Sequence, residues 1–168
     1  MSVEQPAERL GGSSDVAFTV NGRAIELFDV PDCETLAECL RERIGLLGTK
    51  LSCELEVCGA CTVLVDDDPV SACCTLGRDV AGRRVTTVEG LAGEGSALHP
   101  VQRALVESGA IQCGFCTSGV VMTLAALLRR PDLRSEAEIR EFLSGTLCRC
   151  TGYGPILEAA KACVAVAG

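Results

Sequence analysis

Two groups of closely spaced cysteines constrain this chain more than any other feature. The upstream group has C-x4-C-x2-C spacing and a fourth cysteine twelve residues later; it comprises Cys53, Cys58, Cys61 and Cys73. The downstream group joins a C-x2-C pair to a distant C-x-C pair; it comprises Cys113, Cys116, Cys148 and Cys150. Because four thiolates are enough to complete a metal site, each group predicts one such site.

The cellular compartment decides whether cysteines form disulfides or bind metals. Residues 1–15 have no basic start, apolar core or cleavage site of a secretory signal. No run of about eighteen apolar residues is present, so no membrane span is expected. We therefore expect a cytoplasmic protein with reduced thiols, in which metal binding is the leading use of its cysteines.

Zinc is the main rival to iron at these sites. C-x2-C with a second cysteine pair is also zinc spacing, which leaves a zinc-stabilised interaction module open. The C-x4-C-x2-C loop, however, is the spacing of plant-type [2Fe-2S] ligands, and zinc modules seldom use it. The sequence therefore favours two [2Fe-2S] clusters. Cys74 is an alternative to Cys73 as the fourth upstream ligand, and the spacing favours Cys73.

The charge of the chain argues against nucleic acid as a partner. The formal net charge is −8, and two bound clusters would bring it to about −12. Aromatic residues make up 3% of the chain and Trp is absent, so little is available for base stacking.

The N-terminal part is predicted to be a small mixed sheet crossed by one helix, the β-grasp arrangement. Asn21-Gly22 fits a two-residue hairpin turn, and Leu36, Leu40 and Ile44 share one helical face. Cys39, beside that face, is predicted to be buried. The expected elements are strands over 16–20, 23–28, 62–65, 70–76 and 83–88, a helix over 34–44, a cysteine loop over 45–61 and a turn over 66–69.

The C-terminal part is predicted to be four short helices. The first contains Pro100 in its first turn, the second follows Cys116, the third opens with an S-x-x-E capping box at Ser135, and the fourth starts at Pro155. Cys163 lies on the apolar stripe of the fourth helix and is predicted to be buried.

The expected fold class is α+β, an N-terminal β-grasp ferredoxin domain followed by a four-helix bundle. The expected domain boundaries are a flexible tail over 1–14, a plant-type [2Fe-2S] domain over 15–88, a linker over 89–97 and a helical [2Fe-2S] domain over 98–168.

Three runs of residues carry a family resemblance. They are Cys58-Gly59-Ala60-Cys61-Thr62-Val63, Gln112-Cys113-Gly114-Phe115-Cys116-Thr117 and Leu147-Cys148-Arg149-Cys150-Thr151-Gly152-Tyr153. In this order they resemble the small iron-sulfur subunit of molybdenum hydroxylases, the xanthine dehydrogenase family. The resemblance covers residues 15 to about 165.

The resemblance implies an electron-transfer subunit that performs no substrate chemistry itself. It implies a large partner subunit with molybdopterin, often the cytosine dinucleotide in bacteria, and a medium partner subunit with FAD, assembled as a dimer of heterotrimers. Electrons would pass from molybdenum to the downstream cluster, then to the upstream cluster and to FAD. Gln112 matches the position that approaches the pterin, and Cys150 would contact that cofactor while it binds iron. A free-standing two-cluster ferredoxin is the alternative, although the mean hydropathy of +0.31 favours buried partner surfaces.

The chain departs from the family pattern beside the upstream cysteines. It has Ser52 and Glu56 where the family usually has glycine. Both positions are therefore expected to need a positive φ, which glutamate tolerates poorly.

Overall fold

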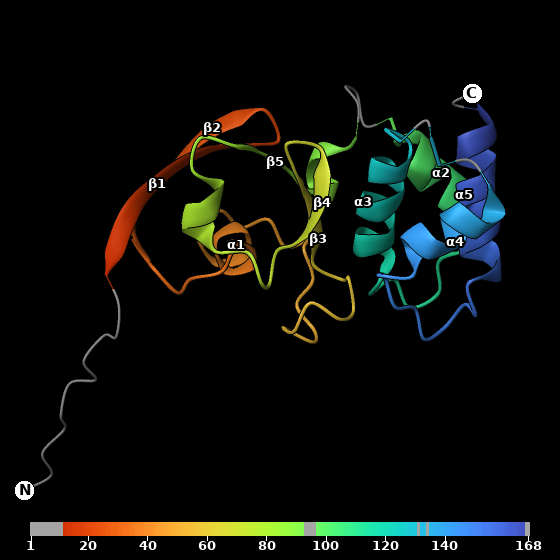
Figure 1. Cartoon of the computed structure of the whole chain (residues 1–168), viewed down its shortest axis with the longest axis horizontal. Helices are drawn as coiled ribbons and strands as arrows, with labels where there is room; N and C mark the ends of the chain where they lie inside the picture. The colour runs from red at the N-terminus through yellow and green to blue at the C-terminus, as the bar shows by residue number, and fades with distance from the viewer. Residues whose placement is uncertain (1–11, 93–96, 131, 134, 167–168) are drawn as a thin grey trace, which may run out of the picture.

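The computed structural model describes residues 12–92, 97–130, 132–133 and 135–166 (Figure 1). It contains a mixed five-stranded sheet followed by a group of helices, in agreement with the predicted α+β class. Residues 1–11 of the predicted tail and 93–96 of the predicted linker lie outside the described residues. No helix in the described part of the chain combines the length and the apolar character needed to cross a membrane.

The sheet has the strand order β2-β1-β5-β3-β4. Its strands are β1 (Ser13–Val20), β2 (Arg23–Pro31), β3 (Thr62–Val65), β4 (Asp68–Ser71) and β5 (Arg84–Thr86). β1 pairs in parallel with β5, and the other pairs are antiparallel. The predicted hairpin is confirmed, because Asn21 and Gly22 form the turn between β1 and β2 with φ of 50° and 79°. β1 begins at Ser13, two residues inside the segment predicted as a tail.

The helix predicted over 34–44 is only partly α-helical. A single α-turn, α1 (Leu36–Glu38), starts at a capping box made by Thr35 and Glu38 and continues as a π-helix, η1 (Cys39–Arg43). Ile44 N–H donates to the carbonyl of Cys39, five residues back, at 3.1 Å. The predicted burial of Cys39 is confirmed, because its side chain is fully buried.

The turn of the second hairpin begins at the predicted residue but is two residues shorter than predicted. Asp66 and Asp67 form the turn, both with positive φ, and Asp68 and Pro69 already belong to β4. Pro69 is tolerated there because β4 is an edge strand, where a missing N–H costs no ladder hydrogen bond. β4 ends at Ser71 rather than near residue 76, and the chain continues through two 3₁₀ turns that flank β5, η2 (Gly77–Val80) and η3 (Val88–Gly90).

The predicted four helices of the C-terminal part are all present. They are α2 (Pro100–Glu107), α3 (Thr117–Leu127), α4 (Glu136–Leu143) and α5 (Gly154–Val166). The capping box of α4 is formed by Ser135 and Glu138, as predicted. Cys163 is 7% exposed in the helical core, which confirms its predicted burial.

Helix α3 lies between the sheet and the other helices (Figure 1). Every residue of α3 from Gly119 to Leu127 is buried, because the helix packs on both sides. Met122 and Ala126 contact Leu64 of β3, and this small apolar cluster joins the core of the sheet to the core of the helices. An ion pair of 3.4 Å between Arg129 and Asp67 also bridges the two parts.

Candidate functional site

The upstream cysteine loop curls around the sulfur of Cys53. The backbone N–H groups of Leu55, Val57 and Cys58 all donate to Cys53 Sγ, at 3.5, 3.4 and 3.4 Å. These donors, that of Leu55 foremost, lower the pKa of the Cys53 thiol from 9.0 to about 6. The loop is therefore built to hold a thiolate at this position, and thiolates are the form that binds metal.

Backbone conformation explains how the loop directs its amides inward. Glu54 and Glu56 have φ of 53° and 58°, in the left-handed region that non-glycine residues seldom occupy. The prediction for Glu56 is confirmed. The prediction for Ser52 is wrong, because Ser52 is not among the described residues with positive φ and the second left-handed residue is Glu54.

Two further upstream ligand candidates, Cys61 and Cys73, lie in the core of the sheet. Cys61 and Cys73 are 3% and 7% exposed, and their thiols interact directly. Burial raises the pKa of the free Cys61 thiol to about 12. Cys74 is exposed, and its Sγ lies 3.6 Å from Cys73 Sγ.

The downstream thiols pair across two segments of the chain. Cys116 is the N-cap residue of α3, and its thiol interacts with that of Cys148, which lies in the loop before α5. Cys113 and Cys150 form the second pair, with their sulfurs 3.6 Å apart. Two thiolates on one tetrahedral metal at about 2.3 Å are about 3.8 Å apart, so this spacing suits a shared metal.

Two residues to which the sequence assigned no individual role, Thr151 and Tyr153, fix the geometry of Cys148. The hydroxyl of Thr151 donates to Cys148 Sγ at 3.2 Å, and the N–H of Tyr153 donates to the same hydroxyl oxygen at 3.2 Å. Burial acts against a thiolate at Cys148, but the hydrogen bonds to its sulfur outweigh burial and lower its pKa. The Tyr153 hydroxyl accepts the Cys148 N–H at 2.9 Å and donates to the carbonyl of Thr146 at 3.3 Å.

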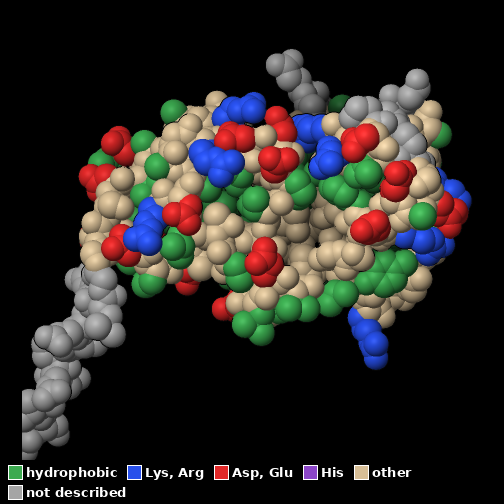
Figure 2. Space-filling model, viewed as in Figure 1, with side chains coloured by type: hydrophobic (Ala, Val, Ile, Leu, Met, Phe, Trp, Pro, Cys, Tyr) green, Lys and Arg blue, Asp and Glu red, His purple; other side chains and the backbone are tan. Residues whose placement is uncertain are grey.

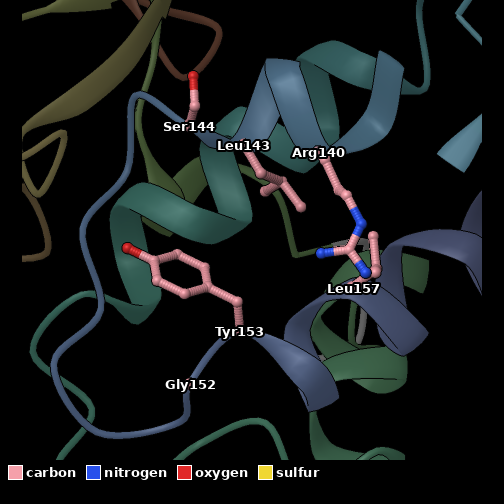
Figure 3. A pocket seen from close by; sticks show the side chains of 6 residues that line it. All are labelled: Arg140, Leu143, Ser144, Gly152, Tyr153 and Leu157. Carbon is pink, nitrogen blue, oxygen red and sulfur yellow. The ribbon is translucent and has the colours of Figure 1, made fainter. Parts of the chain in front are cut away.

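A cavity lies on the other side of Tyr153. It has a volume of about 300 Å³, and Figure 3 shows the Tyr153 ring beside it, with Arg140 reaching in from α4. Its remaining lining residues are Leu143, Ser144, Gly152 and Leu157, and no cysteine is among them. The cavity is therefore adjacent to the thiol site and separate from it.

A backbone hydrogen bond joins the two cysteine groups. Leu147 N–H, directly before Cys148, donates to the carbonyl of Cys58 at 2.9 Å. The contact is close because Gly59 and Gly119 lack side chains; a Cβ at Gly59 would lie 2.3 Å from the carbonyl oxygen of Gly145. A buried hydrogen bond of 3.0 Å between Thr123 and Thr146 supports the same contact.

The surface around the thiols is unusually apolar. Leu55, Val57, Phe115 and Leu147 all neighbour candidate ligands, and they are 74%, 59%, 47% and 50% exposed. Hydrophobic side chains gather along the lower edge of the molecule in Figure 2, below β3 and α3 in the same view in Figure 1. Gln112, together with Cys113 and Cys150, is exposed as well.

The donor set fits two [2Fe-2S] clusters. Each group supplies four sulfurs arranged as two pairs, which matches a cluster that takes two thiolates on each iron. No group of three or more His, Cys, Asp or Glu within the described ranges is arranged to hold a single metal ion.

Comparison with known families assigns both cysteine groups to iron-sulfur domains. Residues 18–92 match the 2Fe-2S iron-sulfur cluster binding domain, and residues 87–161 match a second [2Fe-2S] binding domain.

Three individual proteins illustrate the similarity. The chain is 44% identical over 143 residues to a probable xanthine dehydrogenase subunit of Bacillus subtilis (strain 168), with 85% of this chain and 81% of that subunit covered. It is 43% identical over 160 residues to aldehyde oxidase 2 of Cavia porcellus; 89% of this chain matches only 12% of that longer protein. The crystal structure of quinoline 2-oxidoreductase from Pseudomonas putida 86 superimposes with a TM-score of 0.85 at 40% identity, with 93% of this chain and 96% of that chain covered.

Proposed function

The chain belongs to the small iron-sulfur subunits of the molybdenum hydroxylases, the xanthine dehydrogenase family, and we propose that it relays electrons from molybdopterin in a large subunit to FAD in a medium subunit. The molybdopterin would be the cytosine dinucleotide. When bound, each [2Fe-2S] cluster supplies a one-electron carrier. This chain's own residues hold the two carriers and keep them close together; none acts on the substrate.

The observation that carries this proposal is the direct link between the two cysteine groups. Cys113, Cys116, Cys148 and Cys150 would hold the inner cluster, and Cys53, Cys58, Cys61 and Cys73 would hold the outer one. The Leu147-to-Cys58 hydrogen bond joins the backbone next to one inner ligand to the backbone of an outer ligand. Electrons can therefore follow a short path through bonded atoms inside this chain.

The exposure of some thiols supports the proposed direction of electron transfer and the proposed contacts with the two partner subunits. Cys150, Cys113 and Gln112 reach the surface, where Cys150 and Gln112 would contact the pterin of the large subunit. The exposed Leu55 and Val57 flank the outer site, where the medium subunit would cover them. The complete enzyme would be a dimer of heterotrimers in the cytoplasm.

The domain arrangement follows from the same proposal. Residues 15–88 would form the plant-type ferredoxin domain, with β1 extending it to Ser13, and residues 98–168 would form a four-helix bundle around the inner site. The tail predicted over 1–14 would therefore be limited to the residues before β1, and residues 89–97 would be the linker. The close packing of α3 on β3 supports electron transfer between two domains held at a fixed separation.

Metal analysis and EPR of the purified chain test the proposed function. We expect about four irons and four sulfides per chain, and two distinct EPR signals after reduction with dithionite. Zinc in stoichiometric amount without iron would contradict the proposal. Co-purification with flavin-containing and molybdopterin-containing chains would separate the subunit from a free-standing ferredoxin.

Substitution of Thr151 by Val is expected to lower the reduction potential of the inner cluster. The hydroxyl that donates to Cys148 Sγ stabilises the added negative charge of the reduced state, and valine has nearly the same shape without that donor. An EPR-monitored redox titration should show the inner signal shifted to lower potential and the outer signal unchanged. Thr151→Ser, which keeps the hydroxyl, is the matched control and should titrate close to the wild type. An unshifted inner potential in Thr151→Val would show that the hydroxyl does not act on the sulfur.

A further inference from the structure

The outer site contains one more thiol than a [2Fe-2S] cluster needs. With Cys53, Cys58, Cys61 and Cys73 assigned as ligands, Cys74 is a fifth sulfur at the same place. The inner site has no such extra thiol, because Cys163 is directed to the carbonyl of Pro100 in the helical core, at 3.8 Å. The surplus therefore distinguishes the two sites.

Local backbone structure turns both adjacent thiols toward the outer site. In a β-strand, consecutive side chains point to opposite faces, which would have separated Cys73 from Cys74. β4 ends at Ser71, however, and the N–H groups of Cys74 and Thr75 both donate to the Ser71 carbonyl, at 3.0 and 3.2 Å. This turn brings the two sulfurs to 3.6 Å, close to the separation of about 3.8 Å for two thiolates on one metal.

Cys74 also contacts the loop that carries the other outer ligands. Its thiol lies 4.0 Å from the carbonyl oxygen of Glu54, the residue directly after Cys53. Cys73 is 7% exposed and packed in the sheet core, whereas Cys74 is exposed to solvent. The two sulfurs thus approach the same point, one from the core and the other from solvent.

We propose that Cys74 is an alternative ligand of the outer cluster, able to replace Cys73 on the same iron. This inference rests on the proposed function, because it presupposes an iron-sulfur cluster at the outer site. In the exchange, the Cys74 sulfur forms a bond to iron while the bond from the Cys73 sulfur breaks, and the proton of the Cys74 thiol passes to Cys73. No electron is gained or lost, so the exchange needs neither an oxidant nor a reductant.

Single and double substitutions in the full-length chain test the exchange by iron content, visible absorption and EPR. We expect Cys73→Ala and Cys74→Ala each to retain about four irons per chain, and the double variant to retain about two. Cys73→Ala should show a changed outer EPR signal, because a different cysteine then binds the iron. In all three variants an unchanged inner EPR signal reports an intact fold.

Serine substitution tests the same exchange with less disturbance of the core. In Cys73→Ser we expect the absorption of a cluster with four cysteine sulfurs to persist, because Cys74 supplies the missing one. Cys148→Ser, at the site without a fifth thiol, is the matched control and should lose that absorption or shift it.

Two results would overturn the proposal. A fall to about two irons in both Cys73→Ala and Cys73→Ser, with the inner signal retained, would show that Cys74 does not take over. A fall in Cys74→Ala alone would show that Cys74 is the resident ligand instead. Both results leave the wild-type iron content at about four, so they differ from a failure of the proposed function, in which the wild type itself holds no iron.

Discussion

Replacement of Cys148 by alanine is expected to halve the iron content of the chain, from about four irons to about two. Cys148 pairs with Cys116, and the loss of its sulfur leaves one iron of the inner cluster with a single thiolate. No other cysteine of the helical part is in position to replace it, because the Cys163 thiol contacts Pro100 in the core. Iron analysis and EPR should show the inner signal lost and the outer signal retained.

A matched control separates loss of a ligand from loss of a cysteine. Cys163→Ala removes a thiol from the same helical part. This residue is 7% exposed, and its thiol contacts the carbonyl of Pro100 rather than a proposed ligand. We expect this variant to retain about four irons and both EPR signals. Retention of four irons by Cys148→Ala as well would contradict the assignment of Cys148 to the inner cluster.

Local sequence signals were sufficient where one residue type is required. The Asn21-Gly22 turn was predictable because both positions need a positive φ, and the Ser135–Glu138 capping box because both side chains satisfy free N–H groups at the helix start. The cysteine spacing likewise indicated which thiols lie near one another. The turn and the capping box are formed within a few residues, whereas the cysteine motif also indicated a pair 37 residues apart, Cys113 and Cys150.

Sequence reasoning failed where two structures satisfy the same pattern. The spacing of Leu36 and Leu40 suits an α-helix, yet the segment continues as a π-helix with the same apolar residues buried. Pro69 was interpreted as a turn residue, although it lies in β4, because the edge position of that strand follows only from the order of all five strands.

Folded-back and long-range contacts explain the roles that the sequence did not assign. Thr151 and Tyr153 lie only three and five residues from Cys148, but they reach it because the loop before α5 folds back on itself, and no spacing rule describes that loop. Gly59 lies between Cys58 and Cys61, and its left-handed φ of 66° is consistent with a tight bend. Its close approach to Gly145, however, depends on the packing of two segments more than eighty residues apart in the sequence.

Substitution of Gly119 by alanine is expected to destabilise the chain by about 1–3 kcal/mol. A Cβ at Gly119 would lie 2.1 Å from the carbonyl oxygen of Gly59 and 3.1 Å from Cα of Ala60, and these are backbone atoms of the outer cysteine loop. Gly119 is inside α3, where alanine is intrinsically better than glycine by about 1 kcal/mol. Any net loss of stability must therefore come from the steric clash between α3 and the loop. Denaturant unfolding of the iron-loaded chain measures this loss.

Gly145→Ala provides the comparison, because a Cβ there would meet no atom within 4 Å although Gly145 belongs to the same contact. We expect its unfolding midpoint to stay close to that of the wild type, and equal midpoints for the two variants would contradict the clash.

The clash between α3 and the outer cysteine loop has a functional consequence as well. Displacement of α3 from the loop carrying Cys58 would lengthen the Leu147-to-Cys58 hydrogen bond, which is 2.9 Å in the wild type. Rapid-mixing measurements on the assembled enzyme should therefore show slower electron transfer between the two clusters in Gly119→Ala and an unchanged rate in Gly145→Ala.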